Sequence, residues 1–270
     1  MSEEDVIYIS WTLLRQHEEC KQKSWLVRNG RRTKIRDFKP FYVGTVVDSI
    51  CRKYLLSAGH FDMVAGVPEM MEETAAKAFS RGDGVLNVSS VQRAEMEEKA
   101  LKCVTALRPI LDDLVLGYEY QPERRFKVPL WVPSRVEGVE RRQVVVRGGV
   151  DIVVRTSRDP DVYVAYDVKS SPSASYVRSM AGQGVFYDLV QSVEFGAPYE
   201  KFAFIAPLVE KQPVLELRVT DEDRRAMAGR IAAMADDIAL GLKEPKKGSE
   251  GCDYCTVRHS CSKFSPVNLL

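Results

Sequence analysis

The N-terminal part of the chain carries apolar residues every three to four positions, which is the period of one face of an α-helix. Residues 6–28 are expected to form a short strand or turn and then a helix, for which Ser10 supplies an N-cap. Further helices are predicted over residues 44–57, from Pro68 to about Arg81, and from Val88 to about Leu114.

From Gln121 onward the apolar residues recur at every second position, which is typical of strands. Helices are also predicted, over residues 175–194 and 221–242. The order of elements predicts a mixed α/β core with an N-terminal helical layer. We divide the chain into a helical region (1–120), a core (121–242) and a cysteine tail (243–270). The strands are predicted over residues 126–132, 143–154 with an interruption at Gly148-Gly149, 161–169, 202–205 and 214–219.

Composition limits the classes of protein that the chain can represent. Of its 270 residues, 45% are hydrophobic and 29% are charged, which supports a sizeable core and excludes bulk disorder. The formal net charge of +1 gives no overall basic field, so nucleic-acid binding would need a local patch. The acidic start and the lack of a long apolar run indicate neither a signal peptide nor a membrane span. A soluble cytoplasmic protein with reduced thiols is therefore expected.

Three cysteines form a tight motif in the tail, Cys252-x2-Cys255-x5-Cys261. In an intracellular protein this spacing usually indicates a metal ion or a cluster. A fourth cysteine, Cys20, lies near the N-terminus, and a tail that used it as a ligand would close the chain into a ring. Four thiolates suit either tetrahedral Zn²⁺ or an iron–sulfur cluster, and the spacing does not choose between them.

Acidic residues stand at the ends of two predicted strands. Asp167 and Lys169 are two positions apart, so they share one face of a strand, and Asp151 can lie beside them if the two strands form a hairpin. Adjacent carboxylates repel unless a cation intervenes, and Mg²⁺ prefers such hard oxygen ligands. The alternative is that these residues are solvated charges at strand ends. Against it, Asp167 follows a strongly apolar run, and Gln183 and Tyr187 on the next helix share a face.

These motifs together resemble the PD-(D/E)XK nuclease superfamily and its trailing QxxxY motif. With Cys20 and the tail cysteines included, the chain looks like the RecB/AddB-type branch, which contains CRISPR-associated adaptation exonucleases and phage RecB-like exonucleases. The resemblance runs from Cys20 to Cys261. It implies a restriction-endonuclease-like core sheet flanked by helices.

The resemblance also assigns roles to individual residues. It implies that Asp151 and Asp167 bind Mg²⁺ or Mn²⁺, that Lys169 is the catalytic lysine, and that Gln183 and Tyr187 contact DNA or support the site. Glu123, just before the strand at 126–132, matches an acidic position of the family, with a solvated strand-edge glutamate as the alternative. A [4Fe–4S] cluster held by Cys20, Cys252, Cys255 and Cys261 is implied, with Zn²⁺ as the alternative.

One position departs from the family pattern. Relatives often carry a metal-binding histidine four residues after a helix-opening glycine, whereas Gly44 is followed at that distance by Asp48. Asp48 is expected to replace the histidine as a metal ligand, with a solvated helix aspartate or a favourable charge near the helix N-terminus as the alternatives.

A basic run extends from Lys21 to Lys39, with the aromatic residues Trp25, Phe38, Phe41 and Tyr42 on or near it. Such runs are commonly solvated, but beside a nuclease site they would contact phosphates, and the aromatic rings could stack on unpaired bases.

These observations predict a metal-dependent DNA exonuclease that acts on single-stranded or end-bearing DNA. One alternative is a catalytically weak or inactive DNA-binding subunit of a recombination or CRISPR adaptation complex, and another is a zinc-tailed regulatory or assembly protein. The chain has no Walker A loop, so DNA unwinding would require a helicase partner. Cleavage polarity, strand preference and pathway stay open.

Overall fold

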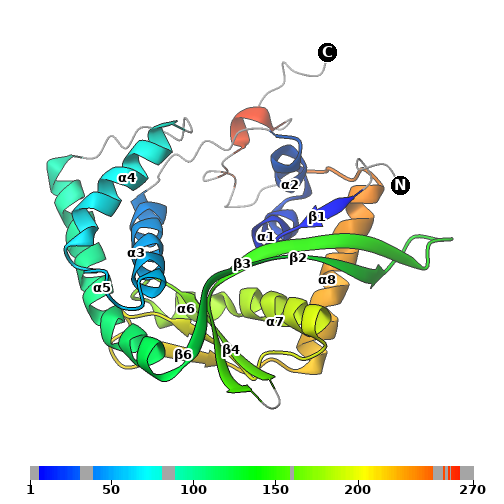
Figure 1. The fold of residues 1–270 in the computed structure, drawn as a ribbon. Helices are drawn as coiled ribbons and strands as arrows, with labels where there is room; N and C mark the ends of the chain where they lie inside the picture. The colour runs from blue at the N-terminus through cyan, green and yellow to red at the C-terminus, as the bar shows by residue number, and fades with distance from the viewer. Residues whose placement is uncertain are drawn as a thin grey trace. The chain divides into compact units, whose positions relative to one another are not determined.

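The computed structural model describes residues 6–30, 39–80, 89–158, 161–245, 252, 255 and 257–261. The chain divides into two compact units. Unit 1 comprises Met1–Arg36, Phe126–Gly148 and Asp221–Leu270, and unit 2 comprises Asp37–Arg125 and Gly149–Thr220. The long strands β2 (Glu119–Pro133) and β3 (Arg141–Arg158) contribute residues to both units (Figure 1).

The sheet of unit 2 is mixed. The second half of β3 pairs antiparallel with β4 (Asp161–Val168), so the two strands form the hairpin on which the placement of Asp151 beside Asp167 depended. Strand β4 pairs in parallel with β5 (Lys201–Ile205), and β5 pairs antiparallel with β6 (Val214–Leu217). The complete order is β1-β3-β4-β5-β6, with β2 paired to β3. This mixed sheet with flanking helices confirms the predicted fold class.

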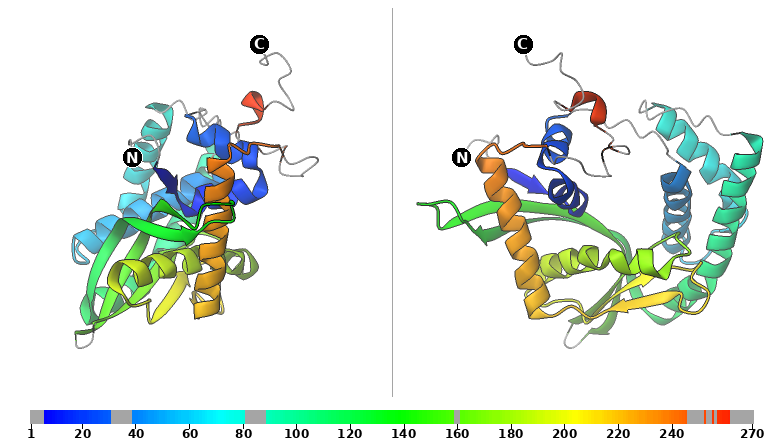
Figure 2. Two further views of the ribbon diagram at one scale, coloured as in Figure 1. Left: turned by 90° about the vertical axis from the view of Figure 1, so that its right-hand side faces the viewer. Right: turned by 180° about the vertical axis from the view of Figure 1, so that it is seen from behind.

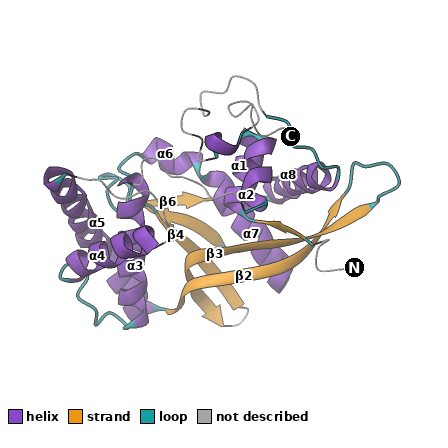
Figure 3. Cartoon of the chain, turned by 90° about the horizontal axis from the view of Figure 1, so that it is seen from above, coloured by secondary structure: helices purple, strands orange, loops and turns teal. Residues whose placement is uncertain are grey.

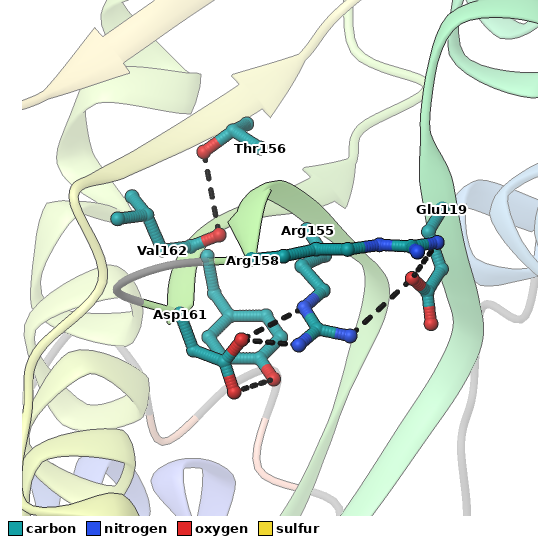
Figure 4. A network of polar contacts seen from close by, with 7 residues as sticks. Glu119, Arg155, Thr156, Arg158, Asp161 and Val162 are labelled. Atoms are coloured by element: carbon teal, nitrogen blue, oxygen red, sulfur yellow. Dashed lines mark hydrogen bonds and ion pairs between the residues drawn. The ribbon is translucent and has the colours of Figure 1, made fainter.

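Salt bridges surround the end of the β3–β4 hairpin. Arg155 is paired with Asp161 and lies 3.4 Å from Glu119, and Arg158 lies 3.3 Å from the same Glu119 carboxylate (Figure 4). The β3–β4 register shifts between Arg155 and Ser157. These exposed contacts lie far along the hairpin from Asp151, and they connect the start of β2 to β3.

Three helices of unit 2 pack against one another: α3 (Lys39–Leu56), α4 (Gly66–Ser80) and α5 (Ser90–Gly117) (Figure 2). Helix α5 begins with a capping box, in which Ser89 and Gln92 bond reciprocally. The apolar faces of the helices share one buried cluster with residues of β3 and β5. This cluster attaches the helical layer to the sheet.

Helix α7 (Ala181–Phe195) follows the short helix α6 (Ala174–Ser179) and packs on β5. The contact is close at Gly184, where a Cβ atom would lie 2.6 Å from Leu217 and 2.8 Å from Phe202. The absence of a side chain therefore sets how near α7 approaches the sheet, and with it the position of Gln183.

Unit 1 combines the two ends of the chain. Strand β1 (Ile7–Ile9) pairs in parallel with the first half of β3. Helices α1 (Trp11–Glu19) and α2 (Lys21–Arg28) follow, and α1 packs against α8 (Asp221–Ala239). A 3₁₀ turn, Arg258–Ser260, lies in the tail. No helix in the described ranges is long and apolar enough to cross a membrane.

Several element boundaries differ from the predictions. Residues 11–28 form two helices, because the backbone of Cys20 is extended. Helix α3 begins at Lys39, so Gly44 lies inside it, and the predicted helix over 175–194 is divided at Met180. Strand β3 continues through Gly148, where a Cβ atom would lie 2.7 Å from the Phe126 ring, so this glycine accommodates a ring and does not interrupt the strand.

Candidate active site

Asp167 is the most deeply buried acidic residue of the predicted site, with 2% of its surface exposed near the end of β4. Its Oδ1 accepts a hydrogen bond from Gln183 Nε2 at 3.1 Å, and its Oδ2 is paired with the ammonium of Lys169. Burial raises the pKa of Asp167, and the charge of Lys169 opposes that rise. Burial lowers the pKa of Lys169, but Asp167 and Asp151 more than reverse this, so the lysine is held as a cation.

Asp151 lies beside Asp167 on the neighbouring strand. It precedes Ile152, which pairs with Tyr166 in the antiparallel ladder. Its Oδ2 accepts a hydrogen bond of 2.7 Å from the backbone N–H of Val168. Burial, followed by the charges of Asp167 and Asp48, raises the pKa of Asp151 well above its ordinary value. The hairpin therefore brings two carboxylates and one lysine together.

Helix α3 contributes a third carboxylate to this group, that of Asp48. The helix backbone at Gly44 passes close to Ser170, directly after Lys169. The side chain of Asp48 reaches solvent, yet desolvation by the surrounding protein, with the charges of Glu123 and Asp167, raises its pKa. The interpretation of Asp48 as a charge near a helix N-terminus is wrong, because α3 begins at Lys39.

Glu123 lies at the edge of the same group, inside β2 and not before it as predicted. Its φ of +49° is in the left-handed region, which is uncommon for a residue other than glycine and typically costs about 1–3 kcal/mol. The carboxylate pairs with Arg52 and lies 3.0 Å from Arg125 Nε. The adjacent Arg124 is buried and bonds to α7 through Gln191 and Glu194, and so anchors the strand.

The Gln183–Tyr187 pair faces Asp167 from α7. Gln183 Nε2 donates to Asp167 and also to the Tyr187 hydroxyl, at 2.9 Å. Tyr187 is 8% exposed, and its ring centroid lies 6.1 Å from that of Phe202. Burial and the charge of Asp167 raise the pKa of the Tyr187 hydroxyl, so it stays protonated.

Sequence reasoning missed Arg52. It stands four residues after Asp48 on α3 and pairs with Glu123, and its charge opposes the rise in the pKa of Asp48. The i to i+4 spacing from Asp48 was the available signal, since it places the two side chains on one helix face. Its pairing with Glu123 joins α3 to β2, and a contact between such distant segments cannot be read from the spacing of residues along the chain.

The sequence profile of the PD-(D/E)XK nuclease superfamily matches residues 8–262 of the chain. The chain belongs to this superfamily. Its members are generally metal-dependent nucleases, which hydrolyse phosphodiester bonds and usually use Mg²⁺ or Mn²⁺. No curated protein sequence matches this nuclease. Among solved structures, the chain is similar to the crystal structure of SSO0001. The match covers 93% of this chain and 94% of that chain, with 15% sequence identity and a TM-score of 0.37.

The carboxylates of this nuclease suit a hard divalent cation by their chemistry. Asp48, Asp151 and Asp167 offer only oxygen donors, and one lysine compensates three negative charges whose proximity raises the pKa of Asp48 and Asp151. In the described part of the chain, no group of three or more His, Cys, Asp or Glu side chains is placed as a ready-made metal site. The donor set fits Mg²⁺ or Mn²⁺, and small side-chain movements would be needed to bind the ion.

The tail cysteines return to the N-terminal helices of unit 1. Cys261 Sγ lies 3.0 Å from the side-chain oxygen of Gln22, two residues after Cys20. The backbone N–H of Cys255 bonds to Cys252, and that of Cys261 bonds to Arg258, so the motif forms consecutive turns. All four are free thiols, and the described cysteines do not form a ready-made metal site.

The predicted basic run is only partly described. Residues 31–38, including Phe38, lie outside the described residues, as does the side chain of Phe41. Trp25 is half-buried on α2, with Lys243 Nζ 4.8 Å from its ring centroid. Tyr42 is 4% exposed within the core of unit 2, so it is not available to stack on a base.

Proposed function

We propose that this nuclease is a DNA exonuclease of the RecB/AddB type, acting on single-stranded or end-bearing DNA. One observation carries the proposal: a buried Asp167–Lys169 pair lies beside Asp151 and near the solvent-accessible Asp48. We infer the exonuclease activity from the resemblance of the ordered motifs to those of RecB/AddB-type exonucleases. Membership of the superfamily supports phosphodiester hydrolysis, and Asp48, Asp151, Asp167 and Lys169 are the residues that would carry it out.

Asp48, Asp151 and Asp167 are the residues that would hold Mg²⁺ or Mn²⁺. When bound, the ion would supply Lewis-acid charge to the scissile phosphate and make a water molecule more acidic. Binding would also relieve the mutual repulsion of the carboxylates, which is strongest where burial removes water.

Lys169 would stabilise negative charge as it develops on the phosphate. Asp167 and Asp151 keep its pKa raised, so it is an ammonium near neutral pH and is poorly suited to accept a proton. A fixed cation in a site shielded from water contributes most where charge appears in the transition state. The electrostatic role is therefore favoured over that of a general base.

Gln183 and Tyr187 would position Asp167. The side chain of Gln183 donates hydrogen bonds to Asp167 and Tyr187, and the Tyr187 ring lies against that of Phe202. We infer that this pair fixes the Asp167 carboxylate in one orientation, with its second oxygen directed to Lys169. Gln183→Ala should weaken cleavage less than Lys169→Ala does.

We further propose that Cys20, Cys252, Cys255 and Cys261 hold a [4Fe–4S] cluster. The contact of Cys261 with Gln22 supports this, because it places one end of the tail beside the N-terminal helices. Protein purified without oxygen should contain iron and inorganic sulfide, with broad absorbance near ~400 nm. Stoichiometric zinc without sulfide would replace the cluster by a zinc site.

The proposed function is tested with DNA labelled at one end, single-stranded or duplex, with and without Mn²⁺. We expect wild-type protein to release short products only with the metal, and Lys169→Ala to lose about 100- to 1,000-fold in rate. Binding of DNA without any cleavage would support the alternative of an inactive DNA-binding subunit. Internal cuts in circular single strands would contradict exonuclease action.

A further inference from the structure

One face of the sheet in unit 1 is exposed and basic. In β2, the even-numbered residues from Phe126 to Val132 are buried, and those between them are exposed. The same alternation in β3 buries Val144 and Val146 and exposes Arg141 and Arg147. Strands β2 and β3 are drawn side by side in Figure 3.

The exposed side chains of three strands gather on this face. The ring of Tyr8 on β1 lies beneath two cations, with Lys127 Nζ 5.2 Å and Arg147 Cζ 5.5 Å from its centroid. Trp131 stands on the same side of β2 as Lys127 and is 60% exposed. We call this surface the basic sheet face, defined by Tyr8, Lys127, Trp131, Arg141 and Arg147.

Two hollows adjoin the basic sheet face, with volumes of 740 Å³ and 450 Å³. Trp25, Trp131 and Arg141 line the larger one, and Tyr8 and Arg147 line the smaller one. Arg28, at the end of α2, lines both. The residues described as lining the hollows include no aspartate or glutamate, so the face concentrates positive charge in a chain whose net charge is only +1.

Three arginines on or beside this surface have no salt bridge within the described part of the chain. Among the described residues, Arg28, Arg141 and Arg147 form no salt bridge, although the chain has 38 acidic residues for 39 basic ones. Arg142, which also lines the larger hollow, differs from them because it is paired with Asp236 on α8. Guanidinium groups without an internal partner are suited to bind phosphates, often with two hydrogen bonds.

We propose that the basic sheet face binds single-stranded DNA, with Arg28, Arg141 and Arg147 on the phosphates and a base stacked on Trp131. An exposed indole offers its ring only to unpaired bases, whose faces are free, which favours a single strand over a duplex. Cations interleaved with aromatic rings are the arrangement that binds single strands with little sequence preference. This inference rests on the proposed function and adds a substrate-holding surface in unit 1, whereas the catalytic residues belong to unit 2.

The test measures binding of a fluorescein-labelled oligothymidine to the full chain by anisotropy in EDTA, so that cleavage plays no part. Trp131→Ala should raise Kd about tenfold, because the ring on which a base stacks is removed. Trp131→Phe should raise Kd much less, because an aromatic ring remains. The double variant Arg141→Gln, Arg147→Gln should lower the slope of log Kd against log salt by about 1.4, since each phosphate contact contributes about 0.7. Trp131→Ala should leave that slope unchanged.

The control is Arg158→Gln, which removes an exposed charge from unit 2. It should leave Kd near the wild-type value, and circular dichroism should show that all variants are folded. Wild-type affinity in the Trp131 and arginine variants, or an equal loss in Arg158→Gln, would overturn the proposal. So would tighter binding of duplex than of single strands. A chain that binds through this face yet never cleaves DNA with Mn²⁺ would contradict the proposed function alone.

Discussion

At the residue scale, the site is defined by the electrostatic conflict among its carboxylates. Asp167 is buried and paired with Lys169, Asp151 lies beside it, and Asp48 adds a third carboxylate that remains accessible to solvent. In proteins such a conflict is resolved by protonation or by a cation. Measurements of metal dependence and of stability against pH distinguish protonation from cation binding.

Asp48 is expected to tune metal affinity. Asp48→Ala removes the accessible carboxylate and should raise the Mn²⁺ concentration needed for half-maximal cleavage about tenfold, because one hard ligand is lost. Asp48→His should recover part of the activity, more with Mn²⁺ than with Mg²⁺, since imidazole suits Mg²⁺ poorly. An unchanged metal titration in the alanine variant would show that Asp48 is not a ligand.

The stability of the metal-free protein should fall as pH rises. Burial raises the pKa of Asp48, Asp151 and Asp167, and repulsion from neighbouring carboxylates adds to the rise at Asp48 and Asp151, so the folded state binds protons more tightly than the unfolded chain. The stabilising contribution of these carboxyl groups is then complete below the ordinary aspartate pKa of about 4. It is lost as pH rises through their raised pKa values. Mn²⁺ should therefore increase Tm more at about pH 8 than at about pH 5.

The control for this prediction is Asp151→Asn, which keeps a carbonyl oxygen for the Val168 N–H but carries no charge. In EDTA it should have a higher Tm than wild type at about pH 8, and Mn²⁺ should add little. A Tm increase from Mn²⁺ that does not vary with pH would argue against coupled carboxylates.

At the element scale, the position of α7 depends on Gly184. Gly184→Ala places a methyl group within 3 Å of Leu217 and Phe202, so the helix or the strands must shift. We expect a loss of about 1–3 kcal/mol in the free energy of unfolding, together with weaker cleavage because Gln183 moves away from Asp167. Gly229→Ala on α8, where no atom lies within 4 Å of the added methyl group, is the matched control and should stabilise slightly, because alanine favours a helix interior more than glycine does.

Most helices and strands could be predicted, because a helix or strand with one buried face carries apolar residues at its own structural period. Alternation predicted the strands that form β3 and β4, and helical spacing predicted α3 and α5. Contacts between distant residues could not be predicted in this way. The Phe126 ring explains why β3 continues through Gly148, and the pairing of Arg52 with Glu123 required the placement of both elements.

At the scale of the whole molecule, the ends of the chain meet in unit 1 through contacts that do not involve the cysteines. Asp237 on α8 is 2.9 Å from both His17 Nε2 and Lys21 Nζ, and Glu18 forms a two-point salt bridge with Arg230. Burial opposes ionisation of Asp237, but the hydrogen bonds of Lys21 and His17 outweigh it and lower its pKa. These contacts attach α1 and α2 to α8.

Asp237→Asn should therefore destabilise the protein near neutral pH. A carboxyl whose folded pKa is lowered contributes stability above its unfolded pKa of about 4 and loses that contribution as pH falls through the folded value. The Tm difference from wild type should thus shrink toward about pH 3. The exposed Asp113→Asn provides the control and should show no such dependence. A Tm difference between Asp237→Asn and wild type that stays constant from pH 7 to about pH 3 would contradict a lowered pKa of Asp237.

The most direct test combines Mn²⁺ binding, followed by paramagnetic resonance, with cleavage of end-labelled DNA in three proteins. Wild type should bind Mn²⁺ and cleave. Lys169→Ala should bind the ion with similar affinity but cleave about 100- to 1,000-fold more slowly, because the lysine supplies charge and not a ligand. The double variant Asp151→Asn, Asp167→Asn should lose both properties. Undiminished Mn²⁺-dependent cleavage by the double variant would contradict the central claim that these carboxylates form the metal-dependent nuclease site.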